Sequence, residues 1–127
     1  LEIRFITGDK KGFQISKRRI VDDMNFKLDL VSTIKRLDWI QKRYDVKKVI
    51  YIGDGILDTI VMKKVLYSIC PANGHELAKK HSNYVTQRSG GDRAVAEACL
   101  HIMKKYFKKI DINNLPKKNK MSGNWKA

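Results

Sequence analysis

The chain has 127 residues, of which 43% are hydrophobic, enough for one globular domain with a buried core. Its formal net charge of +14 is concentrated toward a lysine-rich C-terminus. No stretch is long and apolar enough to span a bilayer, and Cys70 and Cys99 lack the spacing of a metal site or a disulfide framework. These features predict a cytoplasmic protein with reduced cysteines and no membrane partner.

Apolar segments of strand length alternate with segments of helical periodicity along the chain. Strands are expected at residues 3–6, 26–31, 46–52, 67–70 and 84–86. Helices are expected at residues 13–24, 33–44, 58–65, 76–80 and 92–107. This order predicts an α/β fold, a Rossmann-like three-layer arrangement in which helices cover both faces of a parallel sheet.

Residues 1–110 are expected to form one domain, and residues 111–127 a basic, flexible tail. The first residues already have the pattern of a buried strand, so we expect the domain to be truncated at its N-terminus. The lysines of the tail could contact nucleic acid. No stacking platform or reading motif accompanies them, so nucleic acid is not the favoured partner.

The run of residues 50–58 is the most informative segment. An apolar strand stops at the turn Gly53-Asp54-Gly55, and a second carboxylate, Asp58, follows four residues after the first. Open parallel sheets bind ligands at the carboxyl ends of their strands, and Mg²⁺ is usually held there by one or two carboxylates. The sequence therefore predicts Asp54 and Asp58 as magnesium ligands. An alternative is an ordinary strand-to-helix turn in which Asp58 is the N-cap of the next helix.

Other residues are expected at the same edge of the sheet. Thr7 and Gly8 follow the first strand and offer a hydroxyl and an amide to phosphate oxygens, and Asn73 follows the fourth strand at the rim. Lys35 or Arg36, on the second helix, could contact the phosphate from the other side. Such cations usually face solvent on an amphipathic helix, and the choice between the two stays open.

The order of these motifs resembles the haloacid dehalogenase (HAD) superfamily. Residues 6–9 look like its second motif, and residues 53–58 look like its fourth, an acidic Gly-Asp-x-x-x-Asp turn. Residues 83–86, Gly90-Gly91 and residues 94–99 look like the cap-less branch. That branch contains 3-deoxy-D-manno-octulosonate 8-phosphate phosphatase and the phosphatase-like domains of some acylneuraminate cytidylyltransferases.

The resemblance implies a Mg²⁺-dependent phosphatase that acts on a sugar or sugar-acid phosphate and assembles as a homo-oligomer, commonly a tetramer. By the same resemblance, Thr7 would bind the substrate phosphate and Asp54 would ligate Mg²⁺. Asp58 would support the metal through water or orient the cation of the third motif, and Asn73 would shape the rim of the site.

The chain departs from the family pattern in three places. It contains no Asp-x-Asp, the nucleophile motif, so the phosphoaspartyl step has no carboxylate here and the nucleophile is expected upstream of Leu1. Lys27, Lys35 and Arg36 compete for the third motif, and Arg93 stands where a glycine is expected. Two alternatives stay open, a non-catalytic HAD-like module for oligomerisation or regulation and a nucleic-acid-binding protein that uses its basic tail.

Overall fold

A computed structural model describes residues 1–107, which fall into two compact units, residues 1–35 and 36–107. The expected basic tail lies outside the described residues. Each unit is described by itself below.

The unit of residues 1–35 contains one parallel pair of strands. Strand β1 (Phe5–Thr7) pairs with β2 (Leu28–Leu30), with Phe5 opposite Leu28 and Thr7 opposite Leu30. Between them run helix α1 (Phe13–Lys17) and a π-helical turn (Arg18–Asp23). A parallel pair needs such a crossover because its strands cannot be joined by a tight hairpin.

The second unit is built on three parallel strands in the order β3-β4-β5. The strands are β3 (Ile50–Ile52), β4 (Tyr67–Cys70) and β5 (Tyr84–Val85). The helices are α2 (Arg36–Gln41), α3 (Thr59–Met62), α4 (Glu76–His81) and α5 (Ala94–Tyr106).

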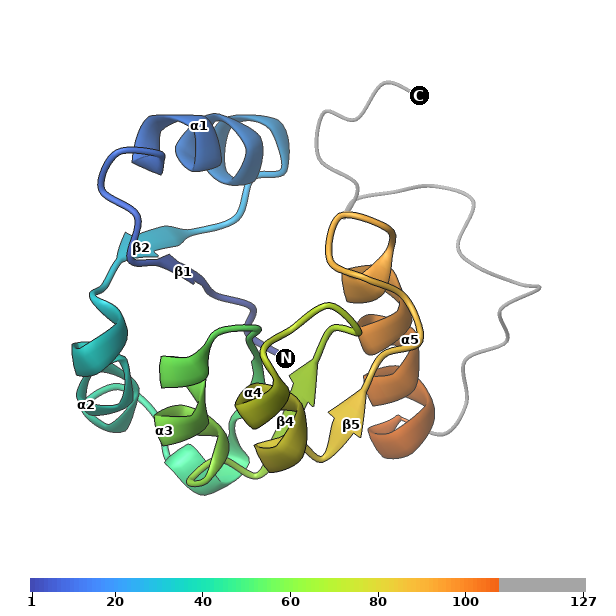
Figure 1. The fold of residues 1–127 in the computed structure, drawn as a ribbon. Helices are drawn as coiled ribbons and strands as arrows, with labels where there is room; N and C mark the ends of the chain where they lie inside the picture. The colour runs from blue at the N-terminus through green and yellow to red at the C-terminus, as the bar shows by residue number, and fades with distance from the viewer. Residues whose placement is uncertain (108–127) are drawn as a thin grey trace. The chain divides into compact units, whose positions relative to one another are not determined.

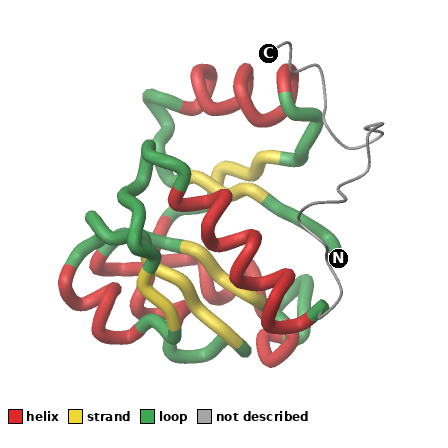
Figure 2. Tube along the Cα trace, turned by 90° about the vertical axis from the view of Figure 1, so that its right-hand side faces the viewer, coloured by secondary structure: helices red, strands yellow, loops and turns green. Residues whose placement is uncertain are grey.

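Helices cover both faces of this sheet. Ile69 on β4 packs against Ala98 and Ile102 of α5. In Figure 2 this helix lies in front of the strands. Side chains alternate along a strand, so Ser68 and Cys70 point to the opposite face, where α3 and α4 lie (Figure 1). Ser68, Ile69 and Cys70 are all fully buried, which makes β4 the centre of the core. The α/β class with parallel strands and covering helices is confirmed.

Some boundaries differ from those expected. The strand expected from residue 46 begins only at Ile50, because the Asp45 carboxylate accepts a hydrogen bond from the Lys47 N–H at 3.1 Å and caps a 3₁₀ turn, Val46–Lys48. The helix expected over residues 13–24 is α-helical only to Lys17 and then continues as a π-turn. One sheet was expected, but among the described residues the strands pair in two separate ladders, one in each unit. No helix in residues 1–107 has the length and apolar character that crossing a membrane requires.

Candidate active site

The turn after β3 is organised around the buried carboxylate of Asp58, which is 4% exposed. Its Oδ2 accepts hydrogen bonds from the backbone N–H groups of Asp54, at 3.0 Å, and Gly55, at 2.8 Å. The side chain therefore reaches back into the turn instead of capping α3, for which it makes no side-chain hydrogen bond. Asp58 thus stands at the N-cap position of α3, as the alternative expected, but its carboxylate caps the preceding 3₁₀ turn and fixes the backbone of Asp54.

The other oxygen of Asp58 is held by two polar side chains. Oδ1 accepts a hydrogen bond from the Arg36 guanidinium at 2.7 Å and one from the Tyr51 hydroxyl at 2.5 Å. The same Arg36 nitrogen also donates to the Tyr51 oxygen at 3.0 Å. Because the Arg36 and Asp58 side chains are only 11% and 5% exposed, this is a buried ion pair with a hydrogen-bonded tyrosine at its side.

This environment shifts the pKa values of the two partners. Burial, followed by the hydrogen bond to Asp58 and its negative charge, raises the pKa of the Tyr51 phenol, which therefore stays a neutral donor. Burial alone would lower the pKa of Arg36, but its hydrogen bond to Tyr51 and the charge of Asp58 outweigh burial and raise it. Both groups keep the protonation state that donates to Asp58.

Gly53 is required by this packing. A Cβ at this position would lie 2.7 Å from Asp58 Cγ and 2.8 Å from Tyr51 Cε1, closer than real side chains approach. The residue before Asp54 must therefore lack a side chain, so that the Asp58 carboxylate can lie beneath the turn.

Asp54 is the exposed carboxylate of the turn. Its N–H donates to Asp58, and its carbonyl oxygen accepts the His75 N–H at 2.8 Å. The main chain of Asp54 is thus held from both sides, while no hydrogen bond or ion pair of its carboxylate is recorded within residues 1–107. A fixed backbone with a carboxylate facing solvent suits a cation ligand.

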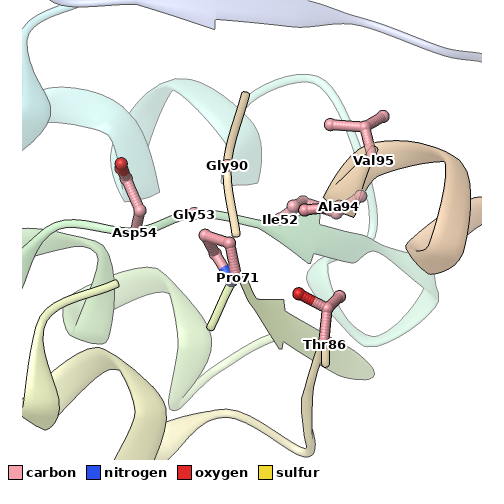
Figure 3. A pocket seen from close by; sticks show the side chains of 8 residues that line it. All are labelled: Ile52, Gly53, Asp54, Pro71, Thr86, Gly90, Ala94 and Val95. Atoms are coloured by element: carbon pink, nitrogen blue, oxygen red, sulfur yellow. The ribbon is translucent and has the colours of Figure 1, made fainter. Parts of the chain in front are cut away.

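A pocket of about 230 Å³ lies beside Asp54 (Figure 3). Its lining is mostly apolar and consists of Ile52, Gly53, Asp54, Pro71, Thr86, Gly90, Ala94 and Val95. In Figure 3, Asp54 and Thr86 lie on opposite sides of the pocket. The Thr86 hydroxyl donates to the Arg88 carbonyl at 2.6 Å, which ties this side of the pocket to the loop that precedes α5.

Asn73 closes the rim through the loop that precedes α5. Its Oδ1 accepts the Gly90 N–H at 2.7 Å, so the loops after β4 and β5 are joined next to the pocket. Farther along this loop, Arg93 has φ of 63°, in the left-handed region that favours glycine. The arginine that departs from the family pattern therefore occupies a conformation that costs a residue with a side chain about 1 kcal/mol.

The remaining sequence candidates lie in the first unit. Thr7 ends β1, and its hydroxyl oxygen accepts the Asp9 N–H at 3.2 Å. Gly8 and Lys35 are exposed, Lys35 at the end of a 3₁₀ turn, Thr33–Lys35. The structure thus brings Arg36, Asp54, Asp58 and Asn73 together in one unit, and it places the phosphate-binding candidates Thr7 and Gly8 in the other.

The fit of a magnesium ion differs between the two predicted ligands. Asp54 offers an exposed carboxylate, whereas both oxygens of Asp58 already accept two hydrogen bonds each. Within residues 1–107, no three His, Cys, Asp or Glu side chains gather to form a metal site. The described part of the chain therefore offers one good ligand, Asp54, with Asp58 as its support.

Sequence reasoning missed Tyr51 and the pocket wall. Tyr51 looked like a core residue within an apolar run, although strand alternation with Ile50 and Ile52 places it on the face where Asp58 lies. Thr86 and Ala94 carried no chemical signal of their own, and only the fold places them beside Asp54.

Residues 9–99 match the family model described as haloacid dehalogenase-like hydrolase. Over 53 residues the chain is 42% identical to the 3-deoxy-D-manno-octulosonate 8-phosphate phosphatase KdsC of Escherichia coli K12, covering 42% of this chain and 28% of that protein. KdsC of Salmonella typhi matches with the same identity and coverage. The chain thus covers less than a third of the length of these curated relatives.

Solved structures show the same fold. The cobalt-bound deoxy-D-mannose-octulosonate 8-phosphate phosphatase of Haemophilus influenzae matches with a TM-score of 0.75 at 19% identity, covering 96% of this chain and 72% of that one. A putative 3-deoxy-D-manno-octulosonate 8-phosphate phosphatase from Vibrio cholerae matches with a TM-score of 0.67 at 30% identity, covering 87% and 63%.

A third match is the Moraxella catarrhalis phosphatase, solved with magnesium, phosphate and KDO. It gives a TM-score of 0.66 at 23% identity, covering 82% of this chain and 61% of that one.

Proposed function

This chain belongs to the haloacid dehalogenase-like hydrolases, and from that membership we propose that it is the metal-binding part of a Mg²⁺-dependent phosphatase. The proposed substrate is a small phosphorylated metabolite, a sugar or sugar-acid phosphate, as the names of the KdsC relatives suggest. We further propose a cytoplasmic homo-oligomer, as the family resemblance implies.

One observation carries the proposal: the network that holds Asp54. Asp58 accepts four hydrogen bonds, and two of them come from the turn that presents the Asp54 carboxylate. A ligand whose backbone is fixed before the metal arrives does not need to be ordered on binding, which favours affinity. When bound, Mg²⁺ would neutralise charge on the phosphoryl group as it transfers.

The residues have distinct proposed roles. Asp54 would ligate the metal, and Asp58 would anchor the turn. Arg36, already bound to Asp58 and Tyr51, would orient that carboxylate instead of reaching the phosphate, which leaves Lys35 as the proposed cation for the phosphate. Thr7 and Gly8 would donate hydrogen bonds to the phosphate oxygens.

The nucleophile must come from another segment, because the sequence holds no Asp-x-Asp. Among residues 1–107, β3 has a ladder partner only on its β4 side, and the apolar pocket lies beside its end. A further strand would pair at the other edge of β3. We propose that a strand preceding Leu1 in the full-length protein pairs there and carries the attacking aspartate.

The test uses the full-length protein with that preceding strand, assayed for phosphate release from a panel of sugar and sugar-acid phosphates. We expect Mg²⁺-dependent release that EDTA abolishes and that Asp54→Asn lowers more than 100-fold, a typical cost of losing a catalytic metal ligand. Asp38→Asn is the control, because Asp38 is an exposed carboxylate of α2 that pairs with Lys42 and has no proposed role in the site, and it should stay near the parent rate.

If the protein releases phosphate from none of the compounds in the panel, the phosphatase proposal is refuted. It would favour a non-catalytic HAD-like module that serves oligomerisation or regulation. The specific observation behind this second candidate is that the chain has neither an Asp-x-Asp nor, within residues 1–107, a three-residue metal cluster.

A further inference from the structure

Four lysine doublets lie at the edge of the three-stranded sheet opposite to Asp54. We call them the lysine edge: Lys47-Lys48, Lys63-Lys64, Lys79-Lys80 and Lys104-Lys105. All eight side chains belong to the second unit, and all except the half-buried Lys79 are exposed.

The topology places the doublets together. The first ends the 3₁₀ turn before β3, the second lies between α3 and β4, and the third closes α4 before β5. Parallel neighbouring strands begin at the same edge of a sheet, the lower edge of this unit in Figure 1. The fourth doublet joins them from α5, since Lys105 Nζ lies 5.0 Å from the ring centroid of Tyr67, the first residue of β4.

The positive charge at this edge is larger than is needed to complement the partial negative charges of the helix C-termini there. One cation near a helix C-terminus complements its partial negative charge, and each doublet supplies two. Lys79 is paired with Glu76 at 2.9 Å, and Asp45 is committed to capping the turn before β3. At the opposite edge the charge of Asp58 is paired with Arg36, and Asp54 adds a carboxylate, so the lysine cluster is confined to the edge where the strands begin.

Exposed apolar side chains stand among these lysines. Leu66 follows the second doublet and is 47% exposed, and Tyr106 and Phe107 follow the fourth and are 38% and 49% exposed. Large apolar side chains next to clustered lysines are the combination that binds lipid surfaces, because the charges attract anionic headgroups and the apolar groups enter the interface.

We propose that the lysine edge docks this protein on the surface of an anionic lipid membrane. The doublets come from helices on both faces of the sheet, so the charge spreads over an area, as a planar surface requires, whereas a nucleic-acid strand follows a line. The contact is peripheral and needs no spanning helix. It leaves the Asp54 edge facing away from the lipid, where it stays open to a substrate from solution.

Co-sedimentation with lipid vesicles tests the proposal. Vesicles of phosphatidylcholine with 30% phosphatidylserine, about the anionic content of a charged leaflet, should bind the full chain, and binding should weaken steeply as salt rises. Each lysine near the surface is expected to contribute about fivefold, so Lys63→Gln with Lys64→Gln should weaken binding about 25-fold. Leu66→Ser should weaken the binding that remains at high salt.

The matched control removes the same charge elsewhere, by Lys10→Gln with Lys11→Gln, an exposed doublet of the first unit. The C-terminal lysines are present in every variant, so a difference between the two double variants reports on the edge. Equal losses from both would overturn the proposal, because binding would then follow net charge. Binding to a single-stranded oligonucleotide without binding to vesicles would overturn it as well. A urea unfolding curve for each variant separates lost binding from lost folding.

Discussion

Two strand-to-helix turns in this chain use an aspartate in the same backbone role, but in different surroundings. After β1, Asp9 Oδ1 accepts the N–H groups of Lys11, at 3.0 Å, and Gly12, at 2.9 Å, and its side chain is exposed. After β3, Asp58 Oδ2 accepts two N–H groups of its own turn, but the residue is buried and its other oxygen is held by Arg36 and Tyr51.

The difference separates the stability that backbone hydrogen bonds give an exposed aspartate, Asp9, from the stability that buried side-chain partners give Asp58. Backbone N–H groups at a turn are enough to order an exposed aspartate, which is common at helix starts. Burial adds a desolvation cost that only charged or polar partners offset, and those partners tie the turn to the core. The turn after β3 is therefore expected to depend on residues distant in sequence, and the turn after β1 is not.

The largest expected effect comes from removing the cation of the buried network. Arg36→Met should lower the free energy of unfolding by about 3 kcal/mol, because it leaves the buried Asp58 carboxylate without its counter-charge. The comparison is Arg4→Met, which breaks the 2.7 Å pair with Asp29, whose side chains are 23% and 32% exposed. That pair is expected to contribute less than about 1 kcal/mol. Urea unfolding of both variants measures the difference, and equal losses would show that the deeper burial of the Arg36–Asp58 pair is not what sets its contribution.

Glycine substitutions separate the turns by sterics. Gly53→Ala should cost about 2 kcal/mol, because the new Cβ meets Asp58 and the ring of Tyr51, neither of which can move without disturbing the network. Gly12→Ala places its Cβ against Asp9 Oδ2, the end of an exposed side chain that can turn into solvent. Its expected cost is about 1 kcal/mol, from weakening the hydrogen bonds that Asp9 accepts from the turn. A Gly12→Ala loss as large as that of Gly53→Ala would show that crowding by Asp58 is not what restricts position 53.

How far the sequence predicts this site can be seen at the same turn. The apolar run and Gly53-Asp54-Gly55 were enough to place the strand end and its acids, because strand periodicity and turn chemistry are local. The choice between Lys35 and Arg36 was not local. Adjacent residues of a helical segment point about 100° apart, and only tertiary packing decides which one meets Asp58.

Other features needed the fold for similar reasons. The segment Val46–Lys48 leads directly into the apolar run of β3, yet the Asp45 cap turns it into 3₁₀. The pocket lining combines the ends of β3 and β4 with the start of α5, residues that no short-range pattern connects. Arg93 is an intermediate case: the resemblance marked it as a departure, and the structure shows a left-handed backbone there.

A smaller effect is expected from the tyrosine of the network. Tyr51→Phe should cost about 1.5 kcal/mol, because it removes one donor to a buried charge that keeps its three other hydrogen bonds. Tyr84→Phe is the matched control, since the Tyr84 hydroxyl donates at 2.9 Å to Glu97 on α5, a carboxylate that is only half-buried. Its unfolding midpoint in urea should move by less than half as much. A larger shift for Tyr84→Phe would show that burial of the acceptor is not the deciding variable.

Glu97 extends the comparison to a carboxylate held mainly by hydrogen bonds, whereas Asp58 also forms a buried ion pair with Arg36. It accepts the N–H groups of Gln87 and Arg88 and the hydroxyl of Tyr84. Desolvation raises the pKa of Glu97, but these hydrogen bonds outweigh desolvation and lower it below the ordinary value of 4.5. A carboxyl whose pKa is lower in the folded state stabilises the fold above its unfolded pKa and loses that contribution as the pH falls through the folded value.

Glu97→Gln removes this titration. The difference in urea midpoint between the parent and this variant should therefore be constant above pH 4.5 and should narrow as the pH falls below it. Unfolding curves at pH 6, 4.5 and 3 measure the trend, a range chosen to bracket the ordinary carboxyl value. The effect is the smallest of the four, since the side chain lies near solvent and its hydrogen bonds compete with water. A gap that stays unchanged down to pH 3 would mean that these hydrogen bonds do not stabilise the ionised form of Glu97.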